Sequence, residues 1–155
     1  MLPRIALLLL VPFVLLASAQ APNDPLIGTW KLNLAKSKYD PGPPPQSQIT
    51  TYAPFGKDGV KRTIDGVNAR GEKDQREENY SFDGKEHPVN NPEADAGVNR
   101  RIDAYTTERI LTKGGRLINA LRRVVSKDGK SLTITELGIN AQGKPFSILQ
   151  VYDKQ

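Results

Sequence analysis

Apolar and polar residues alternate along most of this chain in short stretches, and glycine-containing turns separate the stretches. Leu132 and Ile134 follow this alternation, as do Phe146 and Ile148. A period of two residues sends successive side chains to opposite faces of an extended strand, so the pattern predicts half-buried β-strands. No stretch carries a convincing amphipathic helical period. The sequence therefore predicts an all-β protein.

The turns recur roughly every 8 to 15 residues, which is the spacing of an antiparallel meander. Many contain Asp-Gly or Gly-Gly, and glycine supplies the positive φ that tight hairpins require. The strands predicted between the turns span residues 26–33, 46–55, 60–67, 74–82, 98–104, 106–112, 116–126, 131–140 and 145–153.

A meander of this kind leaves two exposed edges unless the sheet closes on itself. We therefore predict a single antiparallel up-and-down β-barrel of about eight to ten strands. A two-sheet sandwich with Greek-key connections is the alternative, and it needs some long connections. Two segments are long enough. Residues 35–45 (AKSKYDPGPPP) are expected to form a proline-rich strap over one barrel end. Residues 86–97 (EHPVNNPEADAG) are expected to form a lid or a surface loop.

The first nineteen residues have the order of a secretory signal peptide. Arg4 precedes an unbroken apolar run from Ile5 to Leu16, and Ala17-Ser18-Ala19 follows it. The run is shorter than the roughly 20 residues of a membrane-spanning helix. We expect cleavage after Ala19, a barrel domain over residues 20–155, and a secreted or periplasmic protein without a membrane anchor. The chain has no Cys, so we expect the fold to be stable without disulfides.

The net charge of +5 falls to +4 once the segment containing Arg4 is removed. Basic and acidic residues alternate along nearly every segment, which indicates a solvated surface rather than the basic stripe of a nucleic-acid-binding protein. The pairs Arg100-Arg101 and Arg122-Arg123 stand out, because neighbours on a strand face opposite sides. One arginine of each pair is expected to face inward.

Gly28-Thr29-Trp30-Lys31-Leu32 at the start of a hairpin meander, together with the ending Val151-Tyr152-Asp153-Lys154, resembles the lipocalin and fatty-acid-binding superfamily (calycins). The stretches GTWKLNLAKSKYDPGPPP and RRVVSKDGKSLTIT are also similar to a group of small secreted bacterial proteins described as lipocalin-like. The resemblance implies an up-and-down barrel around a ligand cavity. It implies a barrel floor formed by Gly28 and Trp30, with Arg122 or Arg123 over the Trp30 ring.

In fatty-acid-binding proteins an inward arginine on a late strand and an Arg-x-Tyr on the last strand hold the ligand carboxylate. The resemblance places Arg122 at the first of these positions and Tyr152 at the last, but Gln150 replaces the remaining arginine. This departure removes a charge from the expected carboxylate site.

Polar and aromatic residues are mixed on strand faces that should include the inward one. Arg76, Glu78, Tyr80 and Phe82 share one face, and Gln150 and Tyr152 share the face of Phe146 and Ile148. Burying unpaired polar groups costs about 1 to 3 kcal/mol each, which favours a partly hydrated cavity. The candidate ligand-binding residues are Tyr52, Tyr80, Arg122, Gln150 and Tyr152. These side chains could instead pair with one another or face solvent.

No catalytic constellation is recognisable in the sequence. His87, the only histidine, lies near Glu93 and Asp95, but without a second His or a Cys it matches no metal-ligand spacing, and a solvent-exposed loop histidine is expected. We expect no metal and no cofactor. The leading hypothesis is a non-catalytic protein that encloses a small hydrophobic or amphipathic ligand. The alternative is an extracytoplasmic interaction module with a filled core, which binds envelope polymer or protein through its outer surface.

Overall fold

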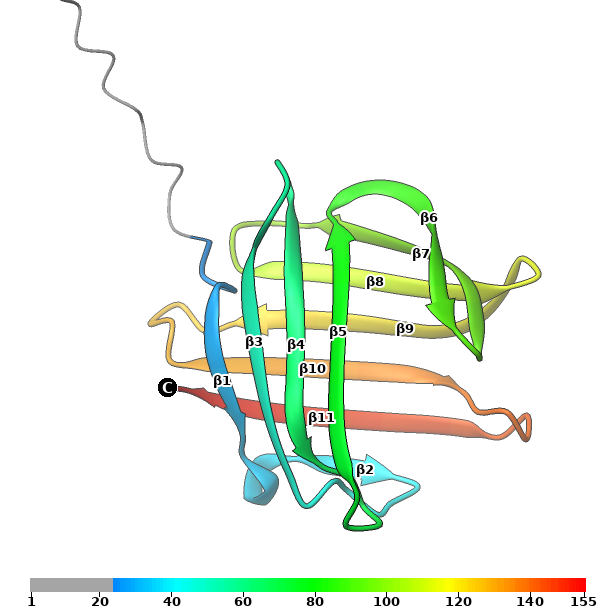
Figure 1. Cartoon of the computed structure of the whole chain (residues 1–155), viewed down its shortest axis with the longest axis horizontal. Helices are drawn as coiled ribbons and strands as arrows, with labels where there is room; N and C mark the ends of the chain where they lie inside the picture. Colours follow the sequence, from blue (N-terminus) through cyan, green and yellow to red (C-terminus); the bar gives the residue numbers. More distant parts are fainter. Residues whose placement is uncertain (1–23) are drawn as a thin grey trace, which may run out of the picture.

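The computed structural model describes residues 24–155, and its strands form one antiparallel barrel (Figure 1). Neighbouring strands are hydrogen-bonded in the order β5-β4-β3-β1-β11-β10-β9-β8-β7-β6. Every consecutive pair from β3 onward, except β5 and β6, is a hairpin, and β1 joins the last strand. The predicted meander barrel is confirmed, and the Greek-key sandwich is excluded.

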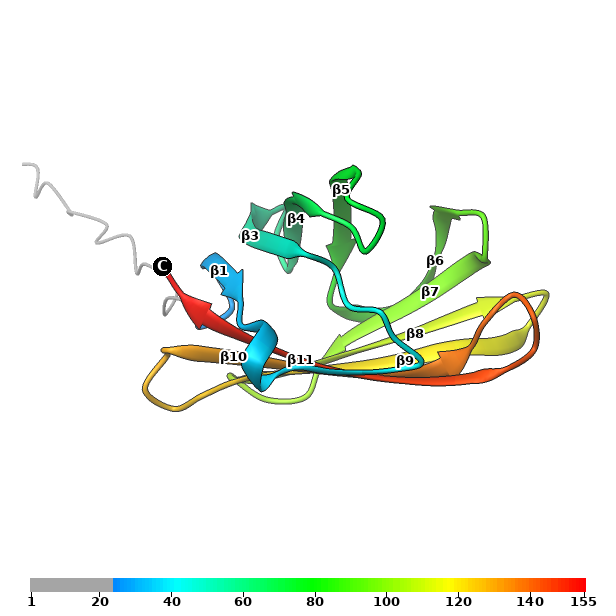
Figure 2. The ribbon, with the colours of Figure 1, turned by 90° about the horizontal axis from the view of Figure 1, so that it is seen from below.

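The ten barrel strands and one short additional strand account for most of the described chain. Their bounds are β1 Gly28–Leu32, β2 Lys38–Asp40, β3 Ser47–Phe55, β4 Gly59–Val67, β5 Lys73–Ser81, β6 Asp83–Asn91, β7 Ala94–Arg101, β8 Thr106–Lys113, β9 Arg116–Val125, β10 Ser131–Ile139 and β11 Pro145–Lys154. Strands β1 and β3–β5 form one wall and β8–β11 the other, with their directions crossing (Figures 1 and 2). No helix among the described residues is long and apolar enough to cross a membrane.

Two predicted connections are wrong in part. Residues 86–97, expected as a lid or loop, belong to the β6–β7 hairpin, in which Pro88 is opposite Ala96. Proline is tolerated there because β6 is an edge of the sheet and its outer side needs no backbone donor. Within the 35–45 strap, Lys38–Asp40 continue the sheet as β2, and Tyr39 is opposite Ile148 of β11.

The edges of the barrel are β5 and β6, which form no ladder with each other. Both are rich in charged residues, as their sequences KDQREENYS and DGKEHPVNN show. Charged side chains and a proline on an edge strand discourage pairing with another chain. The barrel therefore stays open along this seam without presenting an adhesive strand.

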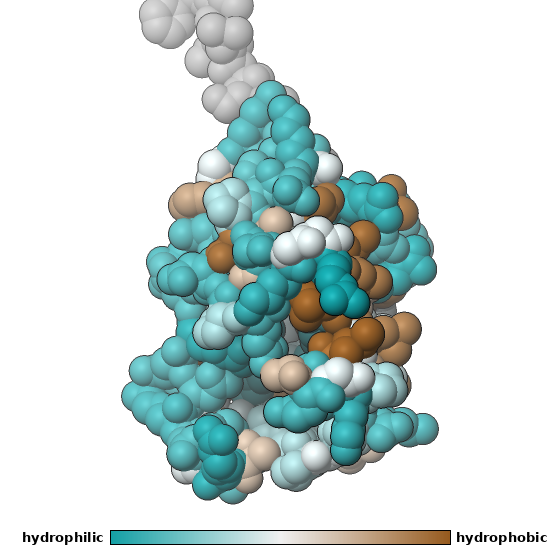
Figure 3. Space-filling view, turned by 90° about the vertical axis from the view of Figure 1, so that its right-hand side faces the viewer, coloured by the Kyte–Doolittle hydropathy of each residue, from teal (hydrophilic) through white to brown (hydrophobic). Residues whose placement is uncertain are grey.

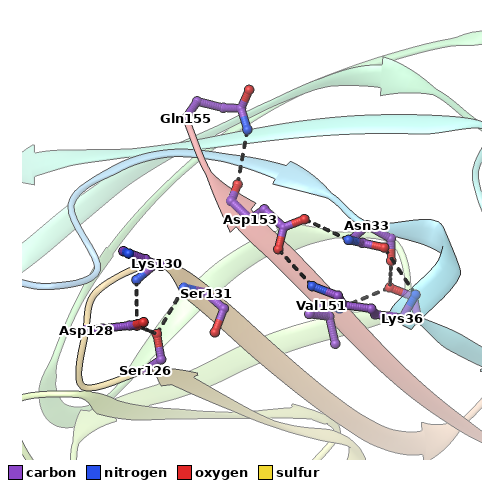
Figure 4. A network of polar contacts seen from close by, with 10 residues as sticks. Asn33, Lys36, Ser126, Asp128, Lys130, Ser131, Val151, Asp153 and Gln155 are labelled. Atoms are coloured by element: carbon purple, nitrogen blue, oxygen red, sulfur yellow. Dashed lines mark hydrogen bonds and ion pairs between the residues drawn. The ribbon is translucent and has the colours of Figure 1, made fainter.

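One edge of β11 is shared by two segments. β1 pairs with its C-terminal part, where Leu32 is opposite Tyr152, and β2 pairs with its middle part. Between them lies the 3-10 turn Leu34–Lys36, where Asn33 donates to Asp153 at 2.7 Å and Val151 donates its N–H to Ser37 Oγ at 3.0 Å (Figure 4). These bonds fix the strap to the last strand.

Trp30 lies in the core with no solvent exposure, and its indole Nε1 donates to the Leu26 carbonyl at 2.9 Å. The cation over its ring is Lys154, whose Nζ lies 4.8 Å from the ring centroid, so the expectation of Arg122 or Arg123 in that place is wrong. Gly28 has a φ of 135°, and a Cβ there would lie 2.9 Å from Lys154 Cε. Glycine thus permits the lysine to cover the indole.

The expected signal peptide and cleavage site lie outside the described residues.

Gly66 allows β3 and β4 to approach closely, so a larger residue at this position is expected to destabilise the fold. A Cβ at residue 66 would lie 2.3 Å from the Ser47 carbonyl oxygen, a backbone atom that cannot rotate away. Gly66→Ala should lower the free energy of unfolding by about 1 to 3 kcal/mol, as measured by urea denaturation. Gly42→Ala is the matched control, since its Cβ meets no atom closer than 3.9 Å. Equal stabilities of the two variants would contradict the prediction.

Candidate ligand-binding site

The three tyrosines predicted to line the site are all buried. Tyr52 of β3, Tyr80 of β5 and Tyr152 of β11 are at most 7% exposed and belong to the core cluster. The Tyr152 hydroxyl accepts a hydrogen bond from Gln48 at 2.6 Å. Gln150 is half-buried and donates to the Tyr39 hydroxyl at 3.1 Å, so the strap contacts the predicted site.

The expected inward orientation of Arg122 is wrong, because Arg123 occupies the interior position. Arg122 is exposed and forms an ion pair with Glu108 at 3.3 Å on the outer face. Arg123 is 1% exposed and lies in register with Ile134, a core residue of β10. Of the other pair, Arg100 also pairs with Glu108, whereas Arg101 lies over the Phe82 ring at 4.8 Å. The expected inward arginine is thus found in the pair 122–123, whereas Arg100 and Arg101 are both exposed and Arg101 forms an ion pair with Asp24.

Five ionisable side chains from five strands form what we call the charged layer: Arg62 of β4, Glu78 of β5, Arg109 of β8, Arg123 of β9 and Glu136 of β10. Glu78 lies between two of the arginines, with Arg109 Nη1 at 3.1 Å and Arg62 Nη1 at 3.7 Å. Both arginine side chains are only 11–12% exposed. Burial opposes ionisation of Glu78, but Arg109 and Arg62 outweigh it and hold the Glu78 pKa below its usual value.

Arg123 has no carboxylate partner among the described residues. Its Nε donates to the Tyr52 hydroxyl at 3.3 Å, and its guanidinium carbon lies 5.1 Å from the centroid of the Tyr80 ring. Both Nη atoms are buried without a hydrogen-bond partner in this part of the chain. A buried charge lacking such partners is costly, because desolvation is not offset by pairing.

The two tyrosines beside Arg123 differ in pKa. Burial alone would raise the pKa of Tyr52, but the charges of Arg62 and Arg123 outweigh burial and lower it. The pKa of Tyr80 is instead raised, chiefly by burial. The cation is thus held by one polarised hydroxyl and by the face of a neutral aromatic ring.

Glu136 completes the layer on the opposite wall. Its Oε1 accepts from Asn119 Nδ2 at 2.8 Å, and it forms no ion pair within the described residues. Burial raises the Glu136 pKa above its usual value, although Arg62 and Arg123 act in the other direction. With Glu136 ionised, the layer holds three positive and two negative charges, and with Glu136 protonated its positive excess grows.

The barrel is packed on one side of the charged layer and more open on the other. Trp30, Tyr52, Leu132 and Tyr152 are fully buried, which leaves no space for a ligand at the base. The residues beyond the layer are only partly buried: Asn119, Leu121, Phe146, Ile148 and Gln150. We call this region the open half.

Apolar side chains gather on part of the hydrophilic end of the molecule that Figure 3 shows. Near the β10–β11 turn there is a recess of about 330 Å³, lined by Asp40, Leu137, Gly138, Pro145, Phe146 and Ser147. The strap residue Asp40 and the interior residue Phe146 thus border the same recess.

His87 takes no part in this arrangement. It lies on the edge strand β6 with its Nε2 2.9 Å from Asp83 Oδ2, and its side chain is 46% exposed. No group of three or more His, Cys, Asp or Glu side chains suited to a metal occurs in the described range.

Solved structures with the same chain path were found by structural comparison, whereas no family model and no curated protein sequence matches the chain. The fluorescent protein UnaG has a TM-score of 0.58 at 11% identity, over 83% of this chain and 96% of that one. The zebrafish ileal bile acid-binding protein complexed with cholic acid has a TM-score of 0.56 at 14% identity, over 84% and 99%. The fold is calycin-like. At these identities the likeness establishes the fold alone.

Sequence reasoning missed three members of the charged layer of this barrel, namely Arg62, Arg109 and Glu136. Each lies on a predicted strand, so the missing information was the register between strands. Arg62 is opposite both Tyr52 and Glu78, and Arg109 is opposite Leu121. A face assigned from the apolar residues Val60 and Ile64 would have found Arg62, because residue 62 shares their side of β4.

The Nη atoms of Arg123 lack hydrogen-bond partners within the described residues, so we expect that removing this buried charge stabilises the fold. Arg123→Met should raise the free energy of unfolding by about 1 to 3 kcal/mol, because an apolar side chain of similar length removes a buried charge. Arg122→Met, on the outer face, should change it by less than about 0.5 kcal/mol. Thermal and urea unfolding of both variants measure this. A clear loss of stability in Arg123→Met would contradict it.

The raised pKa of the Glu136 carboxyl predicts how the free energy of unfolding depends on pH. Because its folded-state pKa lies above the usual 4.5, folding becomes less favourable as pH rises through the interval between these values. Glu136→Gln keeps an acceptor for Asn119 and removes the titration. Its free energy of unfolding should therefore match the parent below about pH 4 and exceed it at pH 7, as urea midpoints across this range would show. A gap independent of pH would refute the assignment.

Proposed function

We propose that this protein binds a small amphipathic organic anion in the open half of the barrel, with its acidic group against the charged layer and its apolar part toward the mouth. Binding occurs by enclosure, without chemistry. The zebrafish neighbour, whose complex contains cholic acid, gives a precedent on the same fold for an amphipathic acid.

The observation that carries this proposal is the excess of positive charge inside the barrel. Three arginines face one ion-paired carboxylate: Arg62 and Arg109 pair with Glu78, and Arg123 has no carboxylate partner among the described residues. Arg62 and Arg109 keep 12% and 11% side-chain exposure, and an anion that reached them would gain charge-assisted hydrogen bonds in a partly desolvated site. Such an anion would also offset the desolvation of the layer as a whole.

The polar site departs from the carboxylate clamp expected from the resemblance. That clamp needs an arginine where this chain has Gln150, whose amide contacts Tyr39 of the strap instead. Here the two arginines that pair with Glu78 come from β4 and β8. In this proposal Arg62 and Arg109, on other strands, supply the charge that is absent at residue 150.

The wall of the open half supplies the apolar surface. Leu121 and Ile148 flank Glu136 on the neighbouring strands, and Phe146 lies one step nearer the mouth. A ligand with its acid at the arginines would lay its hydrocarbon against these side chains, where each buried CH₂ stabilises by about 0.8 kcal/mol. The signal-peptide pattern of residues 1–19 supports a place of action outside the cytoplasm, in the periplasm or beyond it.

Calorimetric titration with dodecanoate, dodecanol and dodecyltrimethylammonium tests the proposal. Dodecanoate should bind at least tenfold more tightly than the other two, because only it pairs with the arginines. Arg109→Gln should weaken dodecanoate at least tenfold and leave dodecanol nearly unchanged. Arg100→Gln, which alters an outward arginine, is the control.

Equal affinity for the acid and the alcohol would remove the role of the charged layer. No heat with any of the three ligands, together with an unchanged melting temperature, would favour the alternative of a filled core that acts through its outer surface.

A further inference from the structure

A second hollow lies on the outside of the barrel, where β1 leaves the sheet. β1 and β3 are paired from Gly28 to Lys31, and the chain then turns away with β2 along β11. The resulting groove has a volume of about 580 Å³, within the range of small-molecule sites. It is lined by Lys31, Leu32, Leu34, Gln46, Ser47, Gln48, Ile49, Asp65, Gly66, Val67 and Lys73.

Apolar side chains form part of the wall of this outer groove, and two of them are exposed. Leu34 is 40% exposed and Ile49 is 42% exposed, although both are large aliphatic side chains. Both border the same groove as Leu32 and Val67, so these four side chains form one concave apolar surface. A concave apolar surface gains free energy when an apolar ligand displaces its water.

The charged side chains at the groove favour an anionic ligand. Lys31 and Lys73 contribute two ammonium groups, and neither has an ion-pair partner within residues 24–155. Asp65 is the only acidic side chain in the lining, and its carboxylate accepts from Gln75 at 3.1 Å. The groove therefore carries one net positive charge beside an apolar floor.

The outer groove is separate from the open half. Gln48, 6% exposed, closes its inner side and donates to the Tyr152 hydroxyl at 2.6 Å and to Thr50 Oγ1 at 3.2 Å. Tyr152 and Thr50 are fully buried. A ligand in the groove therefore meets a packed polar layer rather than the arginines of the interior.

We infer that the outer groove is a second binding site, for a free anionic amphiphile whose hydrocarbon lies on Leu34, Ile49 and Val67 while its acidic head contacts Lys31 and Lys73. The inference goes beyond the interior site and stands without it, since the two sites share no residue.

Titration of ¹⁵N-labelled Arg62→Gln/Arg109→Gln protein with dodecanoate tests the groove, because this variant weakens the interior site. Amide shifts should appear at Lys31, Ile49 and Val67. Lys31→Gln/Lys73→Gln added to this background should weaken binding roughly three- to tenfold, as expected for two exposed ion pairs. Ile49→Thr should also weaken dodecanoate binding, because it removes apolar surface from the groove. Lys57→Gln, at the exposed β3–β4 turn, is the control and should have no effect.

Shifts confined to the open half, or an affinity unchanged by the lysine and Ile49 substitutions, would overturn the inference while leaving the interior proposal intact. If dodecanoate shifts the amides of the groove but not those of the charged layer in the protein with its arginines intact, the groove site stands and the interior proposal is contradicted. If the two lysines affect only the binding of phosphatidylglycerol-containing vesicles and not of monomeric dodecanoate, the groove is a membrane contact and the inference falls.

Discussion

The contact of Arg62 and Arg109 with Glu78 is the constraint on which the interior of this barrel depends. It brings β4, β5 and β8 together across the barrel with side chains that cost free energy to bury. Two cations around one carboxylate can be accommodated only if the excess charge is hydrated or paired. One side of the layer must therefore stay partly open, while Trp30, Tyr52 and Tyr152 fill the other.

The way in which the sheet closes determines where ligands can reach it. β11 is covered first by β1 and then by β2, so the chain between them leaves the wall and creates the outer groove. At the opposite side of the sheet order, β5 and β6 end the ladder without meeting. The closed and the open parts of the barrel both follow from the placement of a few strand ends.

Much of the fold could be predicted from the sequence, because hairpin turns and alternating side chains are local signals. Most predicted strands agree with the observed bounds to within a few residues. The β6–β7 hairpin was missed because its first strand carries Pro88 and almost no apolar residues. An edge strand with one exposed side needs neither a hydrophobic face nor every backbone donor, so it leaves little trace in the sequence.

The site was less predictable, because it depends on which face of a strand each residue occupies. Arg122 and Arg123 are adjacent, and a shift of one residue exchanges inside for outside. Lys154 is the cation over Trp30 because β1 and β11 pair with Trp30 opposite Lys154, a register that local patterns do not contain.

The buried charge of Arg123 bears on the choice between the proposed binding barrel and a barrel with a filled core. A core selected for stability alone would replace Arg123 with an apolar residue, because its Nη atoms lack partners and Tyr80 and Ile134 already surround it with nonpolar surface. Keeping a guanidinium there weakens the fold, and such losses are concentrated where a protein binds or reacts. Hydration alone does not account for the arginine, since its buried nitrogens are not exposed to solvent. Under the proposed function the charge of Arg123 has a use, because in this weakly screened interior it adds to the charges of Arg62 and Arg109 without direct contact with the ligand.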